Sequence, residues 1–300
     1  MPLLDANLVA GVVAGAATAL ALHPLDTVKV RLQVADGVVH AARPAGLLAT
    51  VTDMWRAEGA GVFYRGLGPA LVGAGASWGL YFFFYEAAKR RLEAAGGGAR
   101  LTPAQHGYAA WEGGTLTTLL TNPVWLVKTR MQVEARARAG APAGAAPALA
   151  PYTSLRGALA SILREDGVRG LYRGLAPALL LTSHGVVQFT AYEFFKAAAA
   201  PPGGGALDAR AVFAAGAASK VLATLATYPY QVAKSRLQQR FAGAPAYAGL
   251  LDCAAKIARR EGARGFYKGF AANLLRVAPQ SALTLVVYEA VKSAVEAAQA

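Results

Sequence analysis

A ten-residue stretch occurs three times in this chain and constrains its fold more than any other feature. In each copy, a proline is followed five residues later by lysine, seven residues later by arginine and nine residues later by glutamine. The prolines, Pro24, Pro123 and Pro229, are 99 and 106 residues apart. Similarity at a regular period is typical of structural repeats. We therefore expect three copies of one unit: residues 1–100, 101–204 and 205–300.

The composition favours a helical membrane protein. Hydrophobic residues make up 55% of the 300 residues, charged residues make up 16%, and the 33 glycines would allow close helix packing. Each repeated stretch follows an apolar run. A single helix that includes the apolar run and the repeated stretch would reach the roughly 20 residues needed to cross a bilayer. A second apolar run follows in each unit, after a short amphipathic surface helix. The predicted fold class is all-α membrane, with six transmembrane helices in three pseudosymmetric repeats that form one integrated domain.

The repeated stretch also predicts how the odd-numbered spans are arranged. A proline inside a helix removes a backbone hydrogen bond and kinks the axis. Asp26, Lys29 and Gln33 are three and four residues apart, so they share one helical face. Three kinked helices with such faces could converge on a common axis and close it with ions.

Two further motifs recur once in each unit. In the first motif, which we call the link, an acidic residue is followed directly by glycine. After four further residues come an aromatic residue, a basic residue and a second glycine. The final link glycines, Gly66, Gly174 and Gly269, are expected to begin the even-numbered spans. A tyrosine, an acid and a base in the pattern Tyr-acid-x-x-base begin at Tyr85, Tyr192 and Tyr288.

Charge gives a topology and a class of partner. Basic residues are concentrated in the loops that follow the odd-numbered spans, and the positive-inside rule places these loops on the inner side, with both termini opposite. The net charge of +13 favours an anionic partner. The single cysteine, Cys253, excludes an internal disulfide framework. Few residues precede the first apolar run, so we expect no cleavable signal.

These nine motif instances, spread over the whole chain, resemble those of the mitochondrial carrier family. The resemblance implies a six-helix barrel with threefold pseudosymmetry, one central substrate site and transport by alternating access. It also implies cardiolipin headgroups at the helix N-termini that follow the link glycines, where anions bind. We expect a monomer that needs no cofactor or metal.

The resemblance implies two rings of charged residues that close the cavity in turn. By the family's pairing, Asp26 meets Lys128, but Trp125 and Gln231 occupy the other two acidic positions. We therefore expect a weak matrix gate with a single ion pair. The matrix gate, which we call the inner gate, comprises Asp26, Lys29, Lys128, Lys234, Gln231, Gln33, Gln132 and Gln238. The cytoplasmic gate, which we call the outer gate, comprises Glu86, Lys89, Glu193, Lys196, Glu289 and Lys292.

Residues that break the threefold repeat are candidates for binding a substrate without that symmetry. Arg276 lies in the middle of an apolar span, where a charge is costly and usually functional, and its planar fork suits a phosphate or carboxylate. Lys220 is expected to face the same cavity, whereas Glu112 should hydrogen-bond to a neighbouring helix. A tryptophan could stack on a flat ring. The predicted substrate-binding residues are Arg276, Lys220, Gly73, Trp78, Leu181, Thr182, His184, Gln188 and Trp125.

Local strings indicate a subfamily. Residues 73–85, 122–125, 183–185 and 228–231 resemble the folate/FAD carriers, although Leu181 replaces a glycine expected there. The resemblance implies a transporter that moves folate or FAD across an organellar inner membrane. The alternative is a pyrimidine-nucleotide or NAD carrier of the same fold. The implied location is the mitochondrial inner membrane, with multiple passes, or alternatively the chloroplast envelope.

Two other classes of protein fit the sequence poorly. A soluble, basic helical repeat that binds nucleic acid would not need the long apolar spans. An enzyme is disfavoured because no Ser/His/Asp set, metal cluster or phosphate loop appears, and the four histidines lack ligand spacing.

Overall fold

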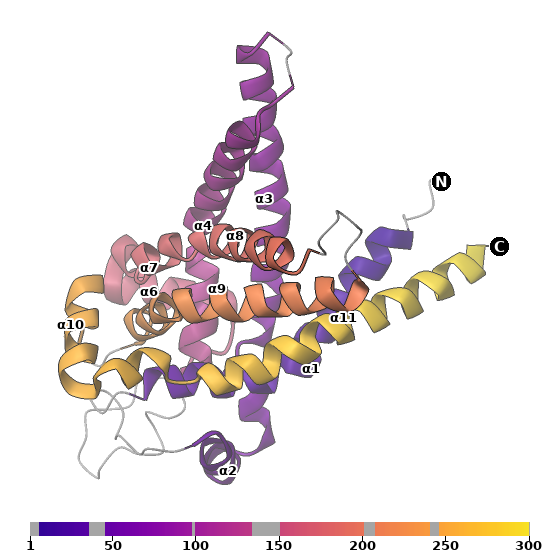
Figure 1. Cartoon of the computed structure of the whole chain (residues 1–300). Coiled ribbons are helices and arrows are strands. Elements are labelled where there is room, and N and C mark those ends of the chain that lie inside the picture. Colours follow the sequence, from indigo (N-terminus) through magenta and orange to yellow (C-terminus); the bar gives the residue numbers. More distant parts are fainter. Residues whose placement is uncertain are drawn as a thin grey trace, which may run out of the picture.

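The computed structural model describes residues 6–35, 46–97, 100–133, 151–200, 208–240 and 246–299 (Figure 1). Every regular element within these residues is a helix. The helices of the predicted spans, which we call the long helices, are α1 (Ala6–Val34), α3 (Leu67–Ala95), α4 (Pro103–Val133), α8 (Ser183–Ala198), α9 (Ala209–Leu237) and α11 (Phe270–Gln299). The other elements are α2 (Leu47–Glu58), η1 (Ala60–Tyr64), α6 (Leu155–Leu171), α7 (Leu175–Leu180), α10 (Leu250–Glu261) and η2 (Ala263–Tyr267).

The long helices pack as three pairs, α3 with α4, α8 with α9, and α11 with α1. Each pair joins helices of two different repeats. The signature helices are α1, α4 and α9, which carry Pro24, Pro123 and Pro229. Helix α1 also contacts both α4 and α9, and α4 bonds to Gln238 just past the end of α9. Figure 1 shows the α3–α4 pair and the α1–α11 pair diverging in different directions. The three pairs are therefore joined through the ends of the signature helices.

Within the described residues, the buried apolar core contains three matching clusters, one in each repeat, and a fourth in which Val30 and Val34 of α1 meet Val133 of α4. Each matching cluster packs the end of a signature helix against the short surface helix of the same repeat. Large apolar side chains elsewhere on the long helices are exposed, such as Phe83 and Val286, as expected for surfaces that face lipid. The clusters centre on Val28, Met54 and Val62, on Leu126, Val127 and Ile162, and on Tyr228, Val232 and Ile257.

The candidate membrane spans agree with the predicted fold class. Within the part of the chain that the structure describes, four segments are long and apolar enough to cross a membrane: Ala10–Val34, Ala60–Ala95, Ala209–Leu237 and Ala263–Glu296. The third predicted span is α4, which has 31 residues but a buried face rich in threonine and asparagine. The fourth is divided between α7 and α8.

We expected the fourth span to be one continuous helix, and the structure corrects this. The helix is interrupted at Leu181 and Thr182, where the backbone N–H of Thr182 bonds to the carbonyl three residues back. The hydroxyl groups of Thr182 and Ser183 also donate to carbonyls three residues back, both at 2.7 Å. Such local bonds compete with α-helical pairing and favour a 3₁₀ turn.

The link glycines begin the even-numbered spans, as predicted. Gly66, Gly174 and Gly269 have φ angles of 81°, 75° and 80°, in the left-handed region that favours glycine. A Cβ atom at Gly66 would lie 2.9 Å from the carbonyl oxygen of Lys128, and one at Gly269 would lie 2.9 Å from that of Lys29. Each link glycine therefore permits close contact between its own repeat and the signature helix of another.

We predict that Gly269→Ala destabilises the protein by about 1 to 2 kcal/mol or more, because the left-handed backbone strains any other residue. The measurement is thermal unfolding in detergent. Gly185→Ala is the matched control, since Gly185 lies in α8 with nothing within 4 Å of an added Cβ, and helix propensity then favours alanine. Equal unfolding temperatures for the two variants would contradict the prediction.

Candidate functional site

Three buried arginines join the signature helices into a ring. Each arginine is about 1% exposed, and its Nε atom donates to the backbone carbonyl of a glutamine on the next signature helix. Helix α1 is thereby bonded to α4, α4 to the end of α9, and α9 to α1. The three contacts join Arg31 to Gln132 at 2.9 Å, Arg130 to Gln238 at 3.3 Å, and Arg236 to Gln33 at 3.0 Å.

Each of these arginines also pairs with the acidic residue of its own link. Burying a guanidinium without a carboxylate would be costly, which explains why the two motifs recur together. Burial of the Glu261 carboxyl opposes its ionisation, but bonds from Arg236 and Lys268 outweigh this effect and lower its pKa. These arginines and acids were not predicted as functional residues, although their recurrence in all three repeats indicated a shared structural role. The pairs are Arg31–Glu58, Arg130–Asp166 and Arg236–Glu261.

The predicted ion pair of the inner gate is confirmed. Lys128 Nζ lies 2.5 Å from Asp26 Oδ2, and Gln132 Nε2 donates to the same oxygen at 3.0 Å. The other two gate glutamines bond to hydroxyl groups instead. Gln33 donates to Tyr228 at 3.1 Å, and Gln238 accepts from Thr129 at 2.9 Å. Only one of the three glutamines therefore braces the ion pair directly.

The other two gate lysines lack carboxylate partners, as predicted. Lys29 donates to the side-chain oxygen of Gln231 at 2.9 Å. Among the described residues, no carboxylate lies within 4 Å of either Lys29 or Lys234. The Trp125 indole donates to Ser77 of α3 at 3.2 Å, and Lys128 Nζ lies 5.5 Å from its ring centroid. The inner gate is thus closed by one ion pair and several neutral bonds.

The outer gate residues do not form an interhelical ring in this conformation. Lys89 pairs with Glu86 at 3.1 Å and Lys196 with Glu193 at 3.8 Å, each within one helix. Lys292 lies 4.0 Å from Glu296 rather than joining Glu289. Among the described residues, the charged side chains of the outer gate thus pair within their own helices, whereas Asp26 and Lys128 of the inner gate pair between two helices.

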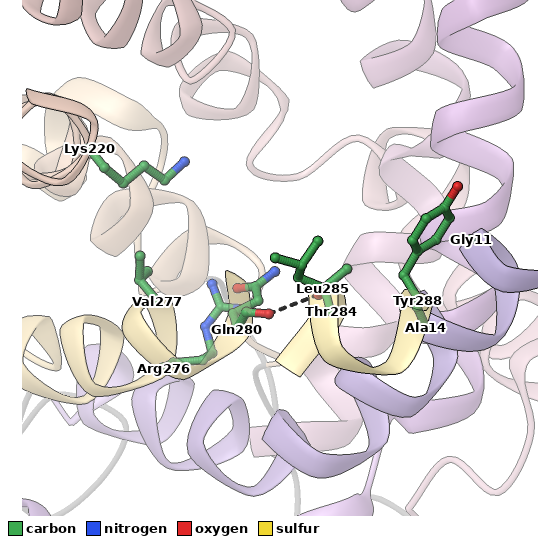
Figure 2. Close-up of a pocket in the computed structure, with 9 residues that line it drawn as sticks. All are labelled: Gly11, Ala14, Lys220, Arg276, Val277, Gln280, Thr284, Leu285 and Tyr288. Atoms are coloured by element: carbon green, nitrogen blue, oxygen red, sulfur yellow. Dashed lines mark hydrogen bonds between the residues drawn. The ribbon is translucent and has the colours of Figure 1, made fainter. Parts of the chain in front are cut away.

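A cavity of about 570 Å³ lies between α1, α9 and α11. Figure 2 shows Lys220 of α9 and Arg276 of α11 extending into the same space. The structure thus brings together the two basic residues that sequence reasoning singled out. The lining residues are Gly11, Ala14, Lys220, Arg276, Val277, Gln280, Thr284, Leu285 and Tyr288.

Lys220 belongs to a polar cluster between α8 and α9. Its Nζ atom donates to Gln188 at 3.1 Å and lies 3.4 Å from His184 Nε2. An ammonium group only donates, so this His184 nitrogen accepts and Nδ1 donates to Thr227 at 2.9 Å. The cluster therefore holds Lys220 toward the cavity through neutral partners.

Arg276 connects the cavity to the inner gate. Its Nε atom lies 4.0 Å from Asp26 Oδ1, whose other oxygen is bound by Lys128. This Nε atom is buried and has no hydrogen-bond partner among the described residues. Asp26 is consequently shared between the closed gate and the cavity.

The structure places the remaining predicted residues elsewhere. A Cβ atom at Gly73 would lie 3.3 Å from Trp125, so this glycine gives the indole room against α3. Trp78 is 65% exposed and stacks on Phe82. Leu181 and Thr182 form the interruption between α7 and α8. None of these five is among the described residues that line the cavity.

Two polar residues of α11 were missed by sequence reasoning. Gln280 and Thr284 lie one and two turns beyond Arg276 and line the cavity. The signal was their four-residue spacing from Arg276. Glu112, by contrast, pairs with Arg91 of α3, which fits the predicted contact with a neighbouring helix.

Comparisons with known proteins agree with the triplicated architecture. A family model described as Mitochondrial carrier protein matches residues 4–95, 99–201 and 206–298. A chloroplastic folate transporter of Arabidopsis thaliana is 42% identical over 295 residues, covering 94% of this chain and 93% of the relative. A chloroplastic nicotinamide adenine dinucleotide transporter of the same plant is 35% identical, covering 95% and 90%. A mitochondrial FAD carrier protein of Saccharomyces cerevisiae is 30% identical, covering 96% of each.

We predict that Gln231→Glu strengthens the inner gate by giving Lys29 an ionic partner at an existing contact. If the new ion pair stabilises the state with the closed inner gate by about 1 kcal/mol relative to the open state, turnover should fall about fivefold. The unfolding temperature should rise. Initial transport rates in liposomes and thermal unfolding in detergent provide the two measurements. Gln105→Glu makes the same change outside the gate and should leave turnover unaltered. Faster turnover of Gln231→Glu would count against a rate limit at the inner gate.

Proposed function

The chain belongs to the mitochondrial carrier family, and on this premise we propose that it moves folate or FAD across an organellar inner membrane by alternating access. The cavity between Lys220 and Arg276 carries this proposal. Its described lining contains two bases and no carboxylate, so it favours an anion. Arg276 suits a carboxylate or phosphate because its fork can donate two parallel bonds.

The relatives narrow the class of substrate. Three of them are named as transporters of folate, FAD and nicotinamide adenine dinucleotide. Each of these compounds combines anionic groups with flat heteroaromatic rings. Identity is higher to the folate transporter, at 42%, than to the nicotinamide adenine dinucleotide transporter, at 35%. This difference supports folate, whereas the relative named as an FAD carrier is 30% identical, so FAD rests on the local strings of the sequence. Our proposal is therefore folate or FAD, and NAD or a pyrimidine nucleotide is the alternative.

The cavity also suggests how an elongated substrate lies. Arg276, Gln280, Thr284 and Tyr288 follow one another at four-residue intervals along α11, over about 18 Å of helix. The anionic group would lie at the end with Arg276 and Lys220. The ring would extend toward Tyr288, beside Gly11 and Ala14 of α1, which line the cavity without bulky side chains (Figure 2).

Binding at this position would act on the inner gate through Asp26. An anion held by Arg276 competes with the Asp26 carboxylate for the same guanidinium. The gate then loses one favourable contact while the anion remains paired. Substrate binding can change a conformational equilibrium only through such a difference in contacts between states.

The membrane and lipid parts of the proposal rest on the family. Relatives are named as chloroplastic or mitochondrial, so we propose an inner membrane of one of these organelles. Binding of cardiolipin at the helices that follow Gly66, Gly174 and Gly269, the monomeric state and the absence of a cofactor or catalytic activity stay predictions.

The test is uptake into liposomes with labelled FAD, folate, NAD and UTP offered in parallel. We expect wild-type uptake of folate or FAD and a loss of about 10- to 100-fold in Arg276→Ala, because a charge-assisted contact is removed. Arg276→Lys should retain part of the activity. Arg210→Ala, at an exposed position near the start of α9, is the control. Normal uptake by Arg276→Ala would exclude Arg276 from the site.

A second variant tests the orientation along α11. Gln280→Leu removes the amide that could bond the neutral part of the substrate, so we expect about a tenfold rise in KM and a smaller preference among the four compounds. Ala282→Leu places the same side chain on another face of α11 and should alter neither quantity. An unchanged preference in Gln280→Leu would place the ring elsewhere.

A further inference from the structure

The inner gate is incomplete at one of its three boundaries. The α1–α4 boundary has the Asp26–Lys128 ion pair, and the α1–α9 boundary has the Lys29–Gln231 bond. At the α4–α9 boundary, Trp125 occupies the acidic position. Lys234 has no carboxylate within 4 Å among the described residues. The second and third repeats therefore meet at the gate without a side-chain bond from the signature lysine.

A different cluster joins these two repeats on the inner side. Arg240 lies two residues beyond the last gate glutamine, past the end of α9. Its Nη2 and Nε atoms donate to the two oxygens of Glu165 on α6, at 2.5 and 3.1 Å. Its guanidinium carbon also lies 4.4 Å from the ring centroid of Tyr152, which precedes α6. The Arg240 side chain is 8% exposed and the Glu165 side chain is 35% exposed, so the contact is covered on the side of Arg240 and open to solvent on the side of Glu165.

Both partners of Arg240 are themselves held in place. The Tyr152 hydroxyl accepts from Nη1 of Arg130, the ring arginine of the second repeat, at 3.3 Å. Ser161 donates to Glu165 at 2.5 Å. Burial opposes ionisation of the Glu165 carboxyl, but the bonds from Ser161 and Arg240 outweigh it and lower its pKa. The cluster is therefore connected to the arginine ring rather than attached to a loose surface.

The other two boundaries cannot form this ion pair. Glu165 immediately precedes the link acid, and the equivalent positions in the first and third repeats hold Ala57 and Arg260. The position equivalent to Arg240 in the first repeat is Ala35. Ala57 therefore excludes an equivalent ion pair between the first and second repeats, and Ala35 excludes one between the third and first repeats. The contact thus occurs at the boundary where, among the described residues, the signature lysine makes neither an ion pair nor a hydrogen bond to the neighbouring repeat.

We propose that Arg240, Glu165 and Tyr152 form a latch that replaces the missing gate pair and holds the second and third repeats together on the inner side. The three are positioning residues, since they act on the gate rather than on the substrate. The latch is closed in the conformation with the closed inner gate. It must separate when that end opens, because α6 and the end of α9 belong to different repeats.

A reversible cross-link distinguishes a latch that opens from a static contact. Glu165→Cys with Arg240→Cys is treated in liposomes with a short bifunctional methanethiosulfonate, while the buried Cys253 stays in place. We expect transport to fall more than about tenfold and to recover on reduction. Asp252→Cys with Lys256→Cys, an ion-paired position within α10, is the matched control and should transport normally when treated. Full transport by the cross-linked latch variant would overturn the proposal.

A second measurement does not depend on the identity of the substrate. A Gln280→Cys variant supplies a cysteine in the cavity for an impermeant thiol reagent added on the inner side. Adding Arg240→Ala should increase the labelling rate about threefold to tenfold, which corresponds to an ion pair of modest energy. Arg240→Glu combined with Glu165→Arg should restore slow labelling, whereas Arg264→Ala, at an exposed arginine, should not change it.

The outcomes separate this inference from the proposed function. If the wild type transports none of the four compounds, the labelling experiment still decides whether the latch holds the inner end closed. An unchanged labelling rate in Arg240→Ala, with an unfolding temperature close to that of the wild type, would overturn the latch and leave the substrate assignment untouched.

Discussion

The fold depends on three guanidinium groups that are buried where the repeats meet. A buried arginine must keep its charge and satisfy its donors, because its pKa is too high for it to be neutralised. Each ring arginine meets this demand with at least two partners, a carboxylate of its own repeat and a backbone carbonyl of the next signature helix. One side chain therefore fixes both the surface helix within a repeat and the contact between repeats.

The contacts that recur in all three repeats differ in kind from the contacts to which we assign a function. The threefold contacts between repeats use backbone atoms, as in the arginine-to-carbonyl bonds and the close approach of Gly66 and Gly269 to lysine carbonyls. Backbone contacts tolerate divergence of the surrounding side chains. The asymmetric contacts use side chains that only one repeat possesses, such as Lys220, Arg276 and Arg240. A substrate without threefold symmetry can be recognised, and a gate can be unequal, without disturbing the scaffold.

The sequence predicted the parts of the fold that depend on periodicity. The 99- and 106-residue spacing located the signature helices, and the link glycines marked the starts of the even-numbered spans because their backbone requires a positive φ. The Asp26–Lys128 pair followed from the family's pairing. The interruption at Thr182 was missed because it depends on hydroxyl groups bonding back to their own helix. The contact of Arg240 with Glu165 joins residues 75 positions apart outside any motif, so no local pattern indicated it.

The unequal gates bear on how the transporter can return between its two states. The outer gate residues already have partners within their own helices, and such exposed pairs contribute little energy. Exchanging them for interhelical pairs therefore costs little. At the inner end, the side chains of the single Asp26–Lys128 pair are only 14 to 15% exposed, and the carboxylate also lies near Arg276. Under the function proposed above, an anion that occupies Arg276 would weaken the contact that keeps the inner end closed, while an empty cavity would leave that contact in place. The same carboxylate would then make opening of the inner end depend on occupancy of the cavity, which a transporter needs in order to avoid leaking.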